Sequence, residues 1–231
     1  MPKRNRISDC DVIIAAAGSS TRFKGRTKKQ FYIVNGKPII IHTILNMLKV
    51  FRPENIIVVS SEKGISKMRT LLYKEGMNGI RIVKGGEERA VSVYNGVLES
   101  RRKYVLVHDG ARPYVPIKVI NRIINTKISD KSCTVPFLCP KETVRIEEKS
   151  GLKTLDRRQI RLIQTPQMFT RNSLEYFMKI SIKKKEYFTD EAEYIIKNGG
   201  KISFVEGDVK NIKITTAEDA EIIKMIMKAE K

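Results

Sequence analysis

Positively charged side chains follow a short run of small residues near the start of the chain. The segment from Gly18 to Arg22 leads into Lys24, Arg26, Lys28 and Lys29. Small residues let backbone N–H groups approach an anion closely, and the lysines and arginines supply the opposite charge. The segment is neither a P-loop, which ends in Gly-Lys-Ser/Thr, nor a G-x-G-x-x-G loop. Its residue types favour a polyphosphate site, although an ordinary turn with solvated charges also fits them.

A carboxylate follows the apolar run Tyr104-Val-Leu-Val-His108. At the carboxyl end of a parallel strand and opposite a phosphate loop, a carboxylate is well placed to hold Mg²⁺ against phosphate oxygens. Asp109 fits that position, and it equally suits capping of turn amides before Gly-Ala-Arg-Pro. For His108 we expect a satisfied structural imidazole rather than a catalytic base.

A glycine pair and a lone lysine complete the set of chemically suggestive residues. Gly85-Gly86 leads through Glu87-Glu88-Arg89 to Ser92. The two glutamates are most simply first-turn acids that complement a helix dipole. Lys213 lies in Asn211-Ile-Lys-Ile214, which we expect to be a short strand, and its side chain could simply face solvent.

The elements that must position these residues alternate in type along the first half of the chain. Apolar runs of strand length occur at residues 12–17, 56–59, 80–83 and 104–108. Stripes with the i, i+3, i+4 spacing of one helix face separate them, at residues 38–48, 65–72, 90–98 and 116–124. This alternation predicts right-handed βαβ units and an α/β fold with a mostly parallel, twisted sheet flanked by helices.

The pattern changes in the second half of the chain. After a strand at 132–137, residues 141–155 alternate around Ser150-Gly151 like a hairpin with too little core to be stable by itself. We expect it to project from the sheet and to pack against a second copy of the chain. Helices are expected at 173–183 and 190–198, short strands at 201–205 and 211–214, and a capping box at Thr216-x-x-Asp219 before the last helix. The organisation predicted is one domain, residues 1–231, with residues 138–158 as an inserted dimerisation arm.

The composition of the chain limits the classes of protein to which it can belong. The chain has 231 residues, 41% hydrophobic and 30% charged, which suits a soluble protein, and no apolar run approaches the ~20 residues of a membrane helix. No signal-peptide h-region follows the basic start, so we expect a cytoplasmic location without membrane association. With three cysteines and two histidines, a zinc site is hard to assemble. A net charge of +20 keeps a nucleic-acid-binding protein as an alternative, but regular aromatic–basic interleaving is missing.

Taken in order, these segments resemble one enzyme family. The shared residues are Ala15-Ala-Ala-Gly18, Arg22, Lys29-Gln30, Gly85-Gly86-x-x-Arg89-x-x-Ser92, Val107-His-Asp-Gly-Ala-Arg-Pro113, Thr143, Asp156-Arg157, Gln164-Thr-Pro-Gln167, Thr189-Asp-Glu-Ala192 and Asn211-Ile-Lys213. The ordered set resembles the 2-C-methyl-D-erythritol 4-phosphate cytidylyltransferases of the non-mevalonate isoprenoid pathway, over nearly the whole chain from about Val12. The resemblance implies a Rossmann-like nucleotidyltransferase fold, a projecting β-arm, a homodimer with arm exchange, and transfer of CMP from CTP to methylerythritol phosphate with Mg²⁺.

The resemblance also implies roles for individual residues. Those expected around the cytidine are Ala16, Ala17, Gly18, Gly86, Glu87 and Ser92. Arg22 and Lys29 match cations that neutralise the triphosphate and the transition state, and Asp109 matches the Mg²⁺-associated carboxylate, with Arg112 beside it. The groups matching the acceptor site are Thr143, Arg157, Thr189 and Lys213, of which Thr143 and Arg157 would come from the partner's arm.

This sequence departs from the family pattern in its loop. Ser20 stands where a second glycine is frequent, Phe23 where Met is usual, and Lys28 where Pro is common, so the path of the loop is open although its charge is kept. The arm reads Lys141-Glu-Thr-Val-Arg145 where Asp-Thr-Ile-Lys is typical. A ribitol-5-phosphate or other polyol-phosphate cytidylyltransferase on the same scaffold remains an alternative.

Overall fold

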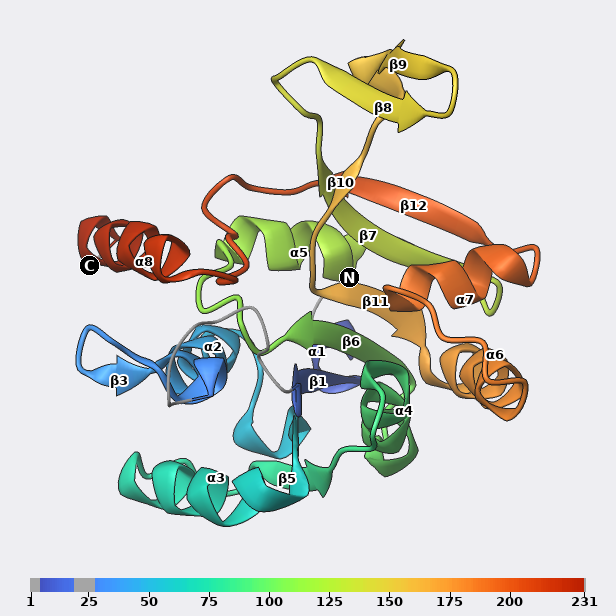
Figure 1. Ribbon diagram of the computed structural model, residues 1–231. Coiled ribbons are helices and arrows are strands. Elements are labelled where there is room, and N and C mark those ends of the chain that lie inside the picture. Colours follow the sequence, from blue (N-terminus) through green and yellow to red (C-terminus); the bar gives the residue numbers. More distant parts are fainter. Residues whose placement is uncertain (1–4, 19–27, 231) are drawn as a thin grey trace.

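A central sheet carries helices on both of its faces (Figure 1). The computed structural model describes residues 5–18 and 28–230. The sheet runs in the order β10-β7-β11-β6-β1-β4-β5, and β12 pairs with β7. Neighbours β6, β1, β4 and β5 are parallel, as are β7 and β12, so the predicted α/β fold with a mostly parallel sheet is confirmed. The strands of this sheet are β1 (Cys10–Ala16), β4 (Ile56–Ser60), β5 (Arg81–Lys84), β6 (Tyr104–Asp109), β7 (Ser132–Leu138), β10 (Leu162–Ile163), β11 (Gln167–Thr170) and β12 (Lys201–Glu206).

The connections between strands are mainly helical. The α-helices are α1 (Asn5–Ser8), α2 (Ile39–Leu48), α3 (Glu62–Lys74), α4 (Arg89–Glu99), α5 (Ile117–Asn125), α6 (Arg171–Lys183), α7 (Glu191–Lys197) and α8 (Ala217–Ala229). Single 3-10 turns are η1 (Lys29–Phe31), η2 (Pro53–Asn55) and η3 (Arg157–Gln159), and β2 (Ile33–Val34) pairs with β3 (Lys37–Pro38) in a small hairpin. Among the described residues, no helix is long and apolar enough to cross a membrane.

Two apolar layers hold the helices against the sheet. In β1, Val12 and Ile14 face α2, α3 and α5, while Ile13 between them faces the opposite layer, which contains side chains of α4, α6 and α7. All three side chains are completely buried. A strand with apolar residues on both faces is typical of a parallel sheet covered on both sides, and this explains the continuous apolar run in the sequence.

One antiparallel strand interrupts the parallel order. β11 lies between β6 and β7 and is antiparallel to both, with Gln167 opposite Val107 and Met168 opposite Thr134. β10, just before it in the chain, pairs with the end of β7, where Ile163 lies opposite Phe137. The register between β7 and this stretch shifts across residues 164–166. Such interruptions re-aim side chains, and they are frequent beside active sites.

The predicted hairpin is present and projects from the body (Figure 1, yellow). Within the described part of the chain, strands β8 (Val144–Glu148) and β9 (Gly151–Leu155) pair with each other and with no other strand, from Val144 opposite Leu155 to Glu148 opposite Gly151. Their side chains are exposed or only partly buried within the single chain. The description of residues 1–231 as one domain with an inserted arm at 138–158 stays a prediction.

The prediction of a strand at residues 211–214 is wrong. Asn211 N donates to Asp208 O, and Ile214 N donates to Ala111 O, so these backbone groups bond to a turn and a loop rather than to a neighbouring strand. The segment is therefore irregular, although Ile214 is fully buried. The predicted capping box follows it: Thr216 Oγ1 accepts from Asp219 N, and Asp219 Oδ2 accepts from Thr216 N, at the start of α8.

Candidate active site

A cleft of about 470 Å³ opens where β1 and β6 end. Parallel strands bring their carboxyl ends to the same edge of a sheet, so the loops that follow them share one site. The cleft is lined by Ala15–Gly18, Lys28–Gln30, Gly86–Arg89, Ser92, Asp109–Ala111, Lys213 and Thr215.

Most of the predicted site residues lie in this one cleft. Its lining includes Ala16, Ala17, Gly18, Lys29, Gly86, Glu87, Ser92, Asp109 and Lys213. Arg112 does not line the cleft, but it is buried and contacts Asp109. Thr143, Arg157 and Thr189 are exposed and lie outside the lining. Arg22, Ser20 and Phe23 lie outside the described residues, whereas Lys28 lines the cleft and its Nζ donates to Ser61 Oγ at 3.1 Å.

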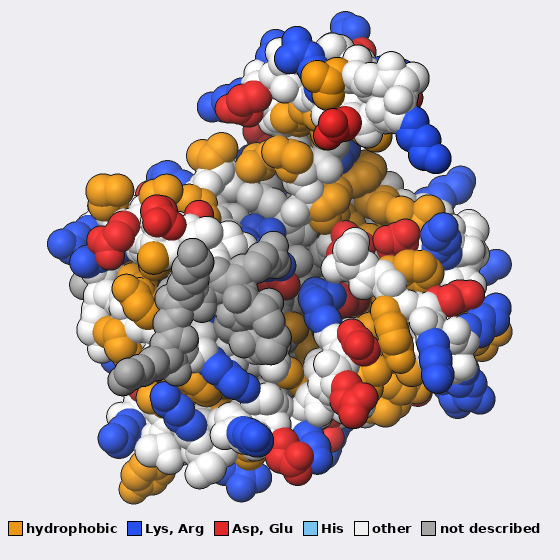
Figure 2. Space-filling model, in the orientation of Figure 1, with side chains coloured by type: hydrophobic (Ala, Val, Ile, Leu, Met, Phe, Trp, Pro, Cys, Tyr) orange, Lys and Arg blue, Asp and Glu red, His pale blue; other side chains and the backbone are white. Residues whose placement is uncertain are grey.

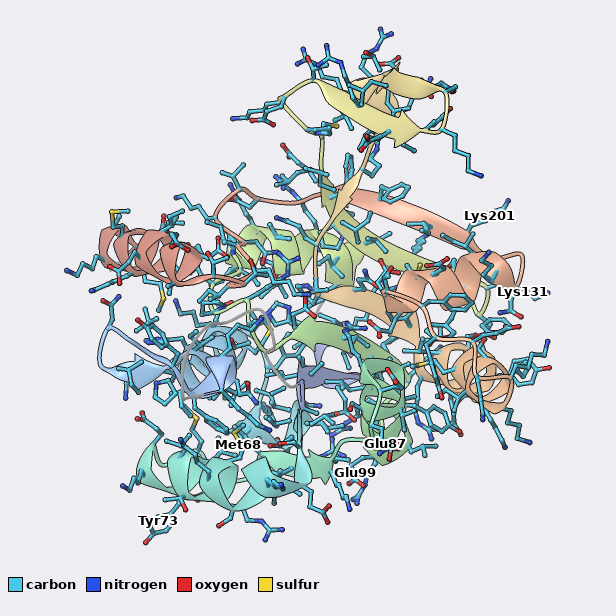
Figure 3. All side chains as sticks on the ribbon, viewed as in Figure 1. Met68, Tyr73, Glu87, Glu99, Lys131 and Lys201 are labelled. Carbon is cyan, nitrogen blue, oxygen red and sulfur yellow. The ribbon has the colours of Figure 1, made fainter. Side chains whose placement is uncertain are left out.

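The glycine pair lets the chain pass close to the start of α4. A Cβ on Gly85 would approach Ala17 Cβ to 2.6 Å, and a Cβ on Gly86 would approach Val91 Cγ1 to 2.3 Å. Gly86 N donates to Ser92 Oγ at 3.1 Å, which fixes the turn against the helix. Glu87 precedes α4 and Glu99 ends it, and both side chains are labelled in Figure 3. Any larger side chain in place of either glycine would push this wall of the cleft outward.

Asp109 is the electrostatic centre of the cleft. Its carboxylate is 7% exposed and faces three cations, with Lys213 Nζ 3.0 Å from Oδ2, Arg112 Nε 3.3 Å from Oδ2 and Arg89 Nη2 3.4 Å from Oδ1. Burial alone would raise the pKa of Asp109, but the charges of Lys213, Arg89 and Arg112 outweigh it and hold the pKa well below its usual range. The carboxylate is therefore ionised at neutral pH, as a metal ligand must be.

His108 is a buried and satisfied imidazole. Its Nε2 lies 3.1 Å from Arg112 O, an acceptor, and its Nδ1 lies 2.9 Å from Thr165 Oγ1, which accepts from Asp109 N. The consistent assignment has Nε2–H donating to Arg112 O and the Thr165 hydroxyl donating to Nδ1. Burial lowers the pKa of His108 to about 4. This geometry agrees with the structural role expected for His108.

Arg89 and Glu191 form a pair that the sequence did not reveal. Arg89 Nη1 donates to Glu191 Oε1 at 2.6 Å, and Arg89 Nη2 donates to Glu191 Oε2 at 3.1 Å. Burial of Arg89 opposes its charged form, but Glu191 and Asp109 more than offset that effect and raise the pKa of Arg89 above its usual value. Both residues belong to segments that resemble the family. Since they are 102 positions apart, however, no local spacing pointed to their contact.

The segment that carries Lys213 is held by buried side chains from the interrupted antiparallel stretch. Gln164 Nε2 donates to Asp208 O at 2.9 Å, and Asn211 Nδ2 donates to Thr165 O at 2.8 Å. Arg112 Nη1 donates to Asn211 O at 2.7 Å. These bonds, rather than a sheet ladder, place Lys213 beside Asp109.

The donor set of the cleft suits a magnesium ion that is shared with a substrate. Among the described residues there is no group of three or more Asp, Glu, His and Cys side chains that could hold a metal by themselves. Mg²⁺ is commonly held by one or two carboxylates together with substrate phosphates. An ionised Asp109 at the edge of a cleft lined with lysines fits that arrangement.

Comparisons with known proteins agree along nearly the whole chain. A sequence model of the 2-C-methyl-D-erythritol 4-phosphate cytidylyltransferase family matches residues 10–229. A 2-C-methyl-D-erythritol 4-phosphate cytidylyltransferase of Clostridium acetobutylicum is 35% identical, over 94% of this chain and 96% of its own. The bifunctional enzyme IspD/IspF of Pelagibacter ubique is also 35% identical, and this chain spans 56% of its length.

Solved structures show the same relationship. The 2-C-methyl-D-erythritol 4-phosphate cytidylyltransferase of Francisella tularensis superposes with a TM-score of 0.77 at 33% identity, covering 94% of this chain and 99% of that one. Neither the polyol-phosphate alternative nor the nucleic-acid-binding alternative is favoured by these matches. The chain belongs to the 2-C-methyl-D-erythritol 4-phosphate cytidylyltransferase family.

Proposed function

We propose that this enzyme transfers CMP from CTP to 2-C-methyl-D-erythritol 4-phosphate. An oxygen of the acceptor phosphate attacks the α-phosphorus of CTP in line, and pyrophosphate leaves. The family supplies the substrates, and the observation that carries the proposal is the ionised Asp109 among Lys213, Arg112 and Arg89 at the cleft. Both substrates are anions, so the reaction needs charge neutralisation and alignment more than proton transfer. A neutral, fully bonded His108 is consistent with a site that uses no general base.

On the nucleotide side, the backbone around Gly18 and Gly86 surrounds the cytidine, together with Ala16, Ala17, Glu87 and Ser92. Lys29, which lines the cleft, neutralises the triphosphate and the charge that shifts to pyrophosphate during transfer. Arg22 is assigned the same task from the sequence alone. Gly86 and Ser92 leave room for a small pyrimidine edge.

Asp109 is the residue that would hold Mg²⁺. When bound, the ion neutralises phosphate oxygens and helps to fix their geometry. This chain's own residues do the rest of the positioning. Lys213 and Arg112 hold the Asp109 carboxylate in place, and Lys213, which is 39% exposed, also presents its charge to the acceptor phosphate.

The acceptor side is completed by a second copy of the chain. Within the single chain, Arg157 Nη1 donates to Lys141 O at the base of the arm, and both Arg157 and Thr143 lie outside the cleft lining. Exposed apolar residues surround the arm's base, where Leu162, Ile163 and Phe204 are 48%, 36% and 45% exposed. Figure 2 shows hydrophobic side chains gathered between the arm and the body. Burial of this surface in a homodimer would bring Thr143 and Arg157 to the partner's cleft, where Thr189 joins them.

Release of pyrophosphate from CTP tests the proposal. Purified enzyme with Mg²⁺ is given methylerythritol phosphate in one assay and ribitol 5-phosphate in a matched one. We expect rapid release with the first acceptor and little with the second. Equal rates, or a preference for ribitol 5-phosphate, would refute the acceptor assignment. The cytoplasmic location remains a prediction from the sequence.

A further inference from the structure

The two oxygens of Asp109 have different surroundings. Oδ2 receives both close cations, Lys213 at 3.0 Å and Arg112 at 3.3 Å. Among the described residues, Oδ1 has one cationic neighbour, Arg89 Nη2, at 3.4 Å, which is beyond the usual range of a strong charged hydrogen bond. Oδ1 is thus the oxygen better suited to meet a cation from the cleft.

Arg89 makes its shorter contacts with Glu191 rather than with Asp109. The guanidinium makes its two short bonds, 2.6 and 3.1 Å, to the Glu191 carboxylate, whose side chain is only 1% exposed. A planar guanidinium bound through two nitrogens by one carboxylate has a fixed orientation. Its remaining approach to Asp109 is the long 3.4 Å contact.

Glu191 is itself held rigidly. It opens α7, where Asp190 Oδ1 accepts from Glu193 N at 3.1 Å as the N-cap. Gln167, fully buried in β11, reaches the same turn twice: its Nε2 donates to Asp190 Oδ2 and its Oε1 accepts from Ala192 N, each at 3.2 Å. Since Gln167 is paired with Val107 of β6, the turn is tied to the strand that carries Asp109.

We infer that Glu191 is a positioning residue for Asp109: by binding Arg89 through both nitrogens, it keeps the guanidinium from occupying Oδ1 and so leaves that oxygen to the metal ion. This inference rests on the proposed function, since it takes Asp109 as the metal carboxylate. A purely structural pair between α4 and α7 would stabilise the fold without affecting the metal. The two roles therefore differ in a measurable way.

The substitution that separates them is Glu191→Gln, which keeps the shape of the side chain and removes its charge. Arg89 then has Asp109 as its remaining carboxylate partner, and we expect it to move onto Oδ1. Outer-shell changes of this kind weaken metal binding about 10- to 100-fold. Adding Arg89→Met to Glu191→Gln removes the competing guanidinium, so the double variant should bind the metal more tightly than Glu191→Gln alone.

The probe is Mn²⁺, titrated into enzyme with CTP and no acceptor, with free Mn²⁺ measured by electron paramagnetic resonance. Asp11→Asn is the matched control. Asp11 is a second buried carboxylate, 3.1 Å from Arg81 Nη2, and it lies near the amino end of β1, away from the cleft. Asp11→Asn should lower the melting temperature and leave Mn²⁺ binding unchanged. The inference requires weaker Mn²⁺ binding in Glu191→Gln, with recovery in the double variant.

Two further outcomes keep the inference apart from the proposed function. If Asp109→Asn leaves Mn²⁺ binding unchanged, the metal assignment itself fails. If Asp109→Asn weakens binding but Glu191→Gln does not, or if the double variant is no better than Glu191→Gln, then Glu191 does not act through Arg89 and only the inference is overturned.

Discussion

His108 should make the folded enzyme sensitive to mild acid. Its pKa is about 4 in the folded protein, against about 6.5 for an ordinary histidine. Because the folded pKa is the lower one, the unfolded chain binds a proton between these values while the native protein does not. The contribution of His108 to the stability of the fold is therefore fully present above pH 6.5 and is lost as the pH falls towards 4. Burial is the main reason, because it disfavours the charged imidazolium. In addition, protonation of Nδ1 would remove the acceptor to which the Thr165 hydroxyl donates.

The size of the loss follows from those two pKa values. Each unit of difference between the folded and unfolded pKa is worth about 1.4 kcal/mol, so the neutral imidazole contributes about 3 kcal/mol to the free energy of unfolding. About 2 kcal/mol of this contribution is lost by pH 5. A loss of stability above pH 5 reports on His108 and not on Asp109. The lowered pKa of Asp109 contributes stability that is lost only as the pH falls below about 4. Urea unfolding at pH 7.5 and pH 5.0, followed by circular dichroism at one protein concentration, measures the difference.

The control for this prediction is His108→Asn, which has no imidazole to titrate. The variant starts from a lower stability because it loses native hydrogen bonds, but only the change between the two pH values is compared. We expect the wild type to lose about 2 kcal/mol more than the variant over this range. If both proteins lose the same free energy, the buried neutral imidazole is not the acid-sensitive group and the lowered pKa of His108 is refuted.

Other predictions address catalysis. Lys29→Ala should lower kcat by roughly 10²-fold or more while changing the KM for CTP little, and a change in KM alone would contradict a role in the transition state. Asp109→Asn should reduce turnover and its dependence on Mg²⁺, which a metal titration of the steady-state rate will measure. CTP should be used in strong preference to ATP; equal turnover would refute the cytosine assignment. If the arm completes the partner's site, an equal mixture of Arg157→Ala and Lys29→Ala chains, each nearly inactive, should regain about a quarter of wild-type activity, because about half of the exchanged dimers carry one intact site. Demonstrated exchange without recovery would place Arg157 in its own chain's site.

The sequence predicted those features that depend on local periodicity. Val12, Ile13 and Ile14 signal a strand buried on both faces, and the spacing that follows Pro38 signals a helix. The alternation of strands and helices predicted the parallel sheet. The parallel sheet in turn predicted that the loop after Gly18 and the carboxylate of Asp109 lie at one edge. The structure places Gly18 and Asp109 in one cleft for that reason.

Features that depend on distant contacts were not predictable. β11 has four residues, too few to show a period, and its place between β6 and β7 is set by pairing with strands made earlier in the chain. Asn211–Ile214 alternates polar and apolar residues as a strand does, yet its backbone is bonded by Ala111 and by a turn. The contact between Arg89 and Glu191 joins residues that are 102 positions apart, so no local pattern in the sequence predicts it.

The insertion of β11 has a consequence for synthesis on the ribosome. The four parallel strands β6, β1, β4 and β5 are all contained in residues 10–109, so this half of the sheet can assemble while the chain is still emerging. Its β6 edge, however, must wait for Thr170, roughly 60 residues later, which is roughly 3 to 12 seconds at ordinary elongation rates. During that interval β7 is already available but is not the correct neighbour. The nascent enzyme therefore spends seconds with the β6 edge of its sheet unpaired, and a chaperone that covers this edge would act at that stage.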